Sequence, residues 1–68
     1  MDQSLINRIV EAALLAATQP LTLAQLHGRF PEDEPAPEGS VEQALQQLTE
    51  ACADRGVELV EVASGWRF

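Results

Sequence analysis

The sequence contains few side chains of the kinds that carry out chemistry: one histidine, one cysteine and eleven carboxylates. His27 has no second histidine and no cysteine pair with which to form a metal site or a catalytic pair, so we expect it at an exposed or rim position. Cys52 is the single cysteine and cannot form an internal disulfide. We expect it to be a small buried hydrophobic residue in a reducing cytosol, the alternative being a reactive thiol.

The carboxylates have no arrangement suited to catalysis. They are distributed over the solvent-facing positions of predicted helices and over a loop, and the pattern fixes no pair of them across a pocket. We therefore predict no catalytic residues, no metal site and no cofactor, and we expect a protein that is not an enzyme.

The charge balance restricts the partners that the surface can attract. The formal net charge is −7, with four arginines and no lysine. Binding to DNA depends on neutralising phosphates with basic side chains, and anionic membranes repel the same negative surface. The N-terminus has no basic segment before an apolar run, and the first predicted helix is too short to span a bilayer. We expect a cytoplasmic protein that contacts neither nucleic acid nor membrane directly.

The length predicts a single domain, residues 1–68. A chain of 68 residues buries only about 60% of its unfolded surface, so its stability is marginal. Self-association or a partner would stabilise it.

Residues 40–68 have the pattern of an amphipathic helix that leads directly into a β-hairpin. Ser40 and Gln43 fit a capping box at the start of the helix, and Gly56 is placed to end it in the left-handed conformation. Ser64 and Gly65 supply the turn of the hairpin. The apolar positions of the helix share one arc: Val41, Ala44, Leu45, Leu48, Ala51 and Cys52. A helix followed by such a hairpin is typical of a winged helix.

The first strand of this hairpin is apolar on both sides. Val57 and Leu59 share one face, whereas Val60 and Val62 share the other. A small domain has one core, so the pattern predicts that one face remains available to a partner. The alternative is a β-bulge between Leu59 and Val60, which would turn all four side chains inward.

The first helix is predicted over residues 2–17, with Asp2 as its N-cap and Pro20 shortly after its end. Its apolar arc is broad: Leu5, Ile6, Ile9, Val10, Ala12, Ala13, Ala16 and Ala17. Leu14 and Leu15 lie outside this arc, so at least one of them is expected to face water. Local packing under the following loop is the alternative to a partner contact. Leu14 and Leu15, together with Val60 and Val62, form the candidate protein interface.

A second helix is predicted to begin with a capping box of Thr22 and Gln25, with Leu21 stapled against Leu26.

Residues 31–39 are rich in proline and acidic residues, and this composition predicts a mobile loop. In a DNA-reading helix-turn-helix the two helices are joined by a turn of only about three or four residues, and here an acidic loop replaces that turn. The predicted core consists of Ile9, Ala13, Leu26, Leu45, Leu48, Leu59 and Trp66, with Trp66 as its largest member.

Four strings of the sequence, residues 11–15, 20–22, 55–62 and 65–68, resemble the N-terminal winged-helix domain of segregation and condensation protein B, ScpB. The most specific of them is the strand GVELVEV with the glycine and aromatic residues that follow it. The resemblance implies an α+β winged helix, with a three-helix helix-turn-helix core and a C-terminal β-hairpin wing. It implies no catalytic residues, and it suggests the N-terminal domain of a longer protein.

The family's partners follow from the same resemblance. ScpB proteins form homodimers that associate with the kleisin ScpA and, through it, with the SMC ATPase in chromosome condensation and segregation. Functions carried by the family's second winged helix cannot be transferred to these residues. The alternative function is that of a winged-helix DNA-binding transcriptional regulator, which should carry basic residues on its third helix or wing. Arg67 alone meets that requirement.

Overall fold

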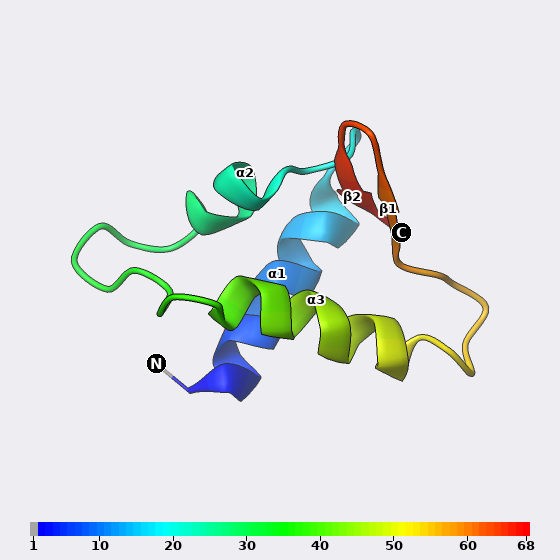
Figure 1. Cartoon of the computed structure of the whole chain (residues 1–68), viewed down its shortest axis with the longest axis horizontal. Coiled ribbons are helices and arrows are strands. Elements are labelled where there is room, and N and C mark those ends of the chain that lie inside the picture. Colours follow the sequence, from blue (N-terminus) through cyan, green and yellow to red (C-terminus); the bar gives the residue numbers. More distant parts are fainter. Residues whose placement is uncertain (1) are drawn as a thin grey trace.

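The computed structural model describes residues 2–68, in which three helices are followed by an antiparallel hairpin (Figure 1). The helices are α1 (Gln3–Ala16), α2 (Leu23–His27) and α3 (Ser40–Ala51). The strands are β1 (Val60–Val62) and β2 (Gly65–Arg67). The most extensive contact between helices joins α1 to α3, and α2 packs on α3 as well. The predicted α+β winged-helix layout is therefore confirmed.

The first two helices begin where the sequence predicts. The Asp2 carboxylate accepts a hydrogen bond of 2.9 Å from the Leu5 N–H, which makes Asp2 the N-cap of α1. At α2 the Thr22 hydroxyl accepts from the Gln25 N–H at 3.1 Å, and the Gln25 side chain accepts from the Thr22 N–H at 2.8 Å. Both caps satisfy backbone donors that have no partner within the helix.

The predicted capping box of α3 is wrong. Its N-cap is Gly39, which has a φ of 78° and makes no side-chain cap. Ser40 lies inside the helix and is buried, and its hydroxyl donates to the Pro37 carbonyl. The left-handed backbone of Gly39 turns the acidic loop into the helix, so the serine that follows is no longer at the cap.

The C-terminal end of α3 also differs from the prediction. The helix ends at Ala51, with Cys52 as C-cap in a right-handed conformation. Gly56 is not one of the glycines with positive φ, which among the described residues are Gly39 and Gly65. Residues 53–58 connect the end of α3 to the buried Leu59.

The wing strand is shorter than the sequence pattern suggests. β1 begins at Val60, and Val57 is exposed while Leu59 is buried. The two residues therefore do not share a buried face, and the bulge that would bring all four apolar side chains inward is not formed. In the hairpin, Val62 pairs with Gly65, so the turn consists of residues 63–64, one position before the predicted pair.

A contact between β2 and the connection from α1 to α2 was missed by the sequence analysis. Leu21 and Trp66 form an antiparallel bridge, in which the Leu21 N–H donates to the Trp66 carbonyl at 2.9 Å and the Trp66 N–H donates to the Leu21 carbonyl at 2.7 Å. The bridge places the hairpin beside the C-terminal end of α1 (Figure 1). Leu21 thus forms an isolated bridge to the two-stranded sheet, a role that the sequence did not predict for it.

The core consists of buried residues from all three helices, the connection from α1 to α2, the loop after α2 and the segment before β1. They are Ile6, Val10, Leu14, Leu21, Leu26, Phe30, Val41, Ala44, Leu45, Leu48 and Leu59. The core positions predicted at Leu26, Leu45, Leu48 and Leu59 are confirmed. Ile9, Ala13 and Trp66 are only partly buried and pack against this cluster, so Trp66 is not the largest member of the buried core as the sequence predicted.

The orientation of α1 explains why Ile9 and Ala13 are only partly buried. Its buried line is Ile6, Val10 and Leu14, which repeat every four residues along one side of the helix. The broad apolar arc in the sequence includes many alanines, and it does not indicate which of its sides faces α3. The side that includes Leu14 is buried, and Ile9 and Ala13 therefore lie at the margin.

The loop between α2 and α3 contains no helix or strand, as predicted for residues 31–39. It is nevertheless attached to the core, because Ala36 packs against the buried cluster. A turn within it joins the Glu34 N–H to the Pro31 carbonyl at 3.1 Å.

Candidate protein interface

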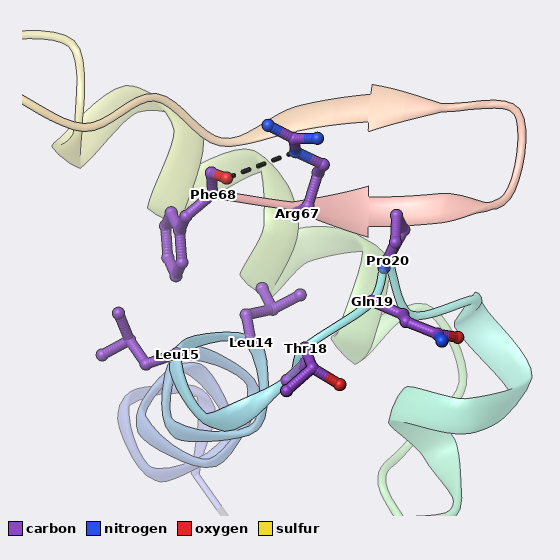
Figure 2. Close-up of a pocket in the computed structure, with 8 residues that line it drawn as sticks. Leu14, Leu15, Thr18, Gln19, Pro20, Arg67 and Phe68 are labelled. Carbon is purple, nitrogen blue, oxygen red and sulfur yellow. Dashed lines mark hydrogen bonds between the residues drawn. The ribbon is translucent and has the colours of Figure 1, made fainter.

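A pocket of about 330 Å³ lies between the C-terminal end of α1 and the end of β2. Its lining residues are Leu14, Leu15, Ala17, Thr18, Gln19, Pro20, Arg67 and Phe68. In Figure 2 the ring of Phe68 and the side chains of the two leucines surround the same space. The Arg67 side chain points away from the leucines, and its Nε donates to the Phe68 carbonyl at 3.4 Å. The lining therefore combines the apolar side chains of Leu14, Leu15 and Phe68 with the polar side chains of Thr18, Gln19 and Arg67.

The structure separates the two adjacent leucines that the sequence placed together. Leu14 is only 4% exposed, whereas Leu15 is 67% exposed. The expectation that at least one of them faces water is confirmed, because a one-residue step on a helix is a rotation of about 100°. Leu14 belongs to the core and also lines the pocket. The role of the two leucines in a protein interface stays a prediction.

The two valines of β1 lie outside this pocket. Val62 is 37% exposed, and Val60 is half-buried. The residue from the hairpin region that meets Leu15 is Phe68 instead. The sequence did not connect Phe68 to α1, because the Leu21–Trp66 bridge that positions β2 joins residues far apart in the chain.

Polar side chains fix the angle between α1 and α3 at the opposite end of α1. The Gln3 side-chain amide donates to the Ser40 carbonyl at 2.9 Å, and the Asn7 amide donates to the Gln47 side-chain carbonyl. Gln3 also donates to Asn7 at 2.9 Å. These bonds link the N-terminal half of α1 to α3 in addition to the apolar contact between the two helices.

The side chains that could carry out chemistry are dispersed. His27 is exposed, as predicted, and its Nε2 lies 3.8 Å from a carboxylate oxygen of Glu42. Cys52 is buried, as predicted. Within residues 2–68 no three histidine, cysteine or acidic side chains gather into a group that could hold a metal ion.

Comparison with known proteins identifies the family. A family model described as segregation and condensation complex subunit ScpB matches residues 8–68, which is most of the chain. The chain belongs to the ScpB family. The segregation and condensation protein B homolog of Coxiella burnetii is 43% identical over 60 residues, a match that covers 88% of this chain and 29% of that relative. This chain thus spans less than a third of the relative's length. No solved structure matches the chain significantly.

The ScpB match includes every element that lines the pocket. It begins at Arg8, in the middle of α1, and continues through Phe68. The resemblance that the sequence strings indicated is therefore confirmed. None of the helices in the described part of the chain is long and apolar enough to cross a membrane.

Proposed function

We propose that this chain is a non-catalytic subunit of an SMC–kleisin complex that acts in chromosome condensation and segregation. In this proposal, residues 1–68 form one domain of a longer cytoplasmic protein. Its partners are a second copy of itself and the kleisin ScpA, with the SMC ATPase bound through the kleisin. The family membership supports the type of complex. The observation that carries the binding role is the exposed Leu15 beside an open pocket to which Leu14 and Phe68 contribute apolar surface.

Leu15 has the properties of an anchor for a protein partner. It projects from a helix whose opposite side is held by the core, so its position is fixed before binding and little ordering remains to be done. Leu14 and Phe68 form the apolar surface beside it. Burial of this surface stabilises a complex by about 25 cal/mol per Å². Val60 and Val62 on β1 extend the proposed contact.

The first test is the effect of a charge on this surface. We expect the wild-type chain to form a dimer whose population rises with concentration, or to bind ScpA, in sedimentation experiments. Leu15→Glu should weaken that association at least about tenfold, equivalent to about 1.4 kcal/mol, because the carboxylate would be desolvated at an apolar contact. Val62→Glu should act in the same direction.

The matched control is Leu5→Glu. Leu5 is also an exposed leucine of α1, but it lies near the other end of the helix and does not line the pocket. If Leu5→Glu weakens association as much as Leu15→Glu does, the loss of association comes from the added negative charge and not from the surface around Leu15. A wild type that is monomeric at millimolar concentration would rule out self-association through this domain and leave ScpA as the partner.

The outer face of α3 argues against the alternative function, that of a DNA-binding regulator. The outer face of α3 is formed by exposed Glu42, Gln43, Gln46 and Glu50, and the helix contains no arginine. We predict no measurable binding of a labelled DNA duplex at low salt, where electrostatic attraction is strongest. Micromolar binding that weakens steeply with added salt would contradict the prediction and favour the regulator.

A further inference from the structure

A second hollow, separate from the Leu15 pocket, lies between α3, the start of α2 and the hairpin. It measures about 440 Å³ and shares no lining residue with the first. Its apolar surface comes from Leu23, Leu45 and Trp66. Leu23 is 39% exposed and Trp66 is half-buried, while Leu45 beneath them is buried. We refer to this hollow as the acidic groove, after the residues at its rim.

The rim carries three carboxylates and no basic side chain. Glu42 and Glu50 belong to α3 and are separated by eight positions, which is about 12 Å along a helix. Glu61 belongs to β1, where it pairs with Trp66 of β2. All three are exposed. Negative charge therefore borders the apolar surface both on the helix and on the hairpin.

We infer that the acidic groove binds a basic segment of a protein partner, in which an apolar side chain is flanked by arginine or lysine. The apolar side chain would cover Leu23 and Trp66. The flanking cations would pair with the carboxylates, and such charge-assisted hydrogen bonds are stronger than those between neutral groups. An arginine over the Trp66 ring would add a cation–π contact.

Charge also selects this occupant over the others. A neutral apolar partner would desolvate the three carboxylates without giving them a counter-charge, which is unfavourable. A second copy of this chain carries a net charge of −7 and has no lysine, so two copies repel each other at such a rim. The inference does not depend on the proposed function, because the two hollows have no residue in common.

Trp66 provides the signal for a direct test, since it is the only tryptophan of the chain. The probe is a blocked peptide of sequence Arg-Arg-Leu-Leu-Arg-Arg, titrated into the protein at low salt while the tryptophan emission is recorded. We expect a saturable change with a dissociation constant on the order of 100 µM. Peptides in which the leucines are serine, or the arginines are glutamate, should bind at least tenfold more weakly. A wild type without a saturable response, or equal binding of the serine peptide, would overturn the inference.

Variants of the rim separate the groove from the overall charge. Glu50→Lys combined with Glu61→Lys should weaken binding of the leucine peptide at least tenfold. The control, Glu32→Lys combined with Asp33→Lys, makes the same change of charge in the exposed loop 31–39 and should stay within about twofold of the wild type. Circular dichroism verifies that each variant is folded.

Two outcomes of this comparison contradict the inference. Equal losses in the rim and loop variants would show that the peptide responds to net charge and not to the groove. Rim variants that change the sedimentation of the chain but leave peptide binding intact would show that a second copy, and not a basic segment, occupies the groove.

Discussion

Replacing Gly65 with alanine is expected to lower the free energy of unfolding by about 3 kcal/mol. Gly65 has a φ of 137°, which is unfavourable for any residue with a Cβ. A Cβ at this position would lie 2.4 Å from the carbonyl carbon and oxygen of Leu21. Relief of that overlap separates β2 from Leu21 and breaks the two hydrogen bonds of the Leu21–Trp66 bridge. Urea denaturation of the variant and the wild type measures the difference.

Gly56→Ala is the matched control for this prediction. A Cβ at Gly56 meets no atom within 4 Å, and its φ is not positive. The change in unfolding free energy should therefore be within about 0.5 kcal/mol of zero. If both variants lose the same stability, the close approach of β2 to Leu21 is not what requires glycine at position 65.

The second large effect is expected at Leu26. It is the one buried residue of α2, and it is fully inaccessible to solvent. Leu26→Ala should lower the free energy of unfolding by about 3 kcal/mol, because it removes buried methyl groups and leaves a cavity that the short helix cannot fill. The total stability of a chain of 68 residues is on the order of 3–10 kcal/mol, so this is a large share of it. Thermal unfolding followed by circular dichroism should show a midpoint lowered by about 15 °C.

Leu23→Ala in the same helix is the control. Leu23 is partly exposed at the acidic groove, so its truncation removes little buried surface and should cost less than about 1 kcal/mol. A loss similar to that of Leu26→Ala would mean that α2 is not held to the core by a single side chain.

The short strand β2 connects the two surfaces to which we assign binding roles. Trp66 lines the acidic groove, whereas Arg67 and Phe68 line the Leu15 pocket. Trp66 and Arg67 lie within β2 and Phe68 follows directly, so this strand and the residue after it contribute to both sites. The Leu21–Trp66 bridge fixes the position of this strand, and Gly65 permits the bridge.

Local features of this protein were determined by the sequence itself. The caps of α1 and α2 at Asp2 and Thr22 follow from side-chain oxygens that satisfy nearby backbone N–H groups. The buried face of α3 follows from the spacing of its apolar residues, and its acidic outer face follows from the residues between them. The strand and aromatic strings were sufficient to indicate the ScpB family. The caps and the helix faces depend on residues a few positions apart in the chain, and the family follows from similarity of the sequence itself.

The tertiary structure decided the features that depend on contacts between distant residues. The sequence could not show that Leu14 is buried and Leu15 exposed, because that depends on how α1 is rotated against α3. It could not show that Gly65 packs on the Leu21 backbone, since the two are 44 positions apart (65 minus 21). The partial burial of Trp66 also depends on a contact between distant residues. Its pairing with Leu21 holds it at the edge of the core, where it lines the acidic groove together with residues of α3. Periodicity reports which side of an element is apolar, and only packing between elements determines how much of that side is covered.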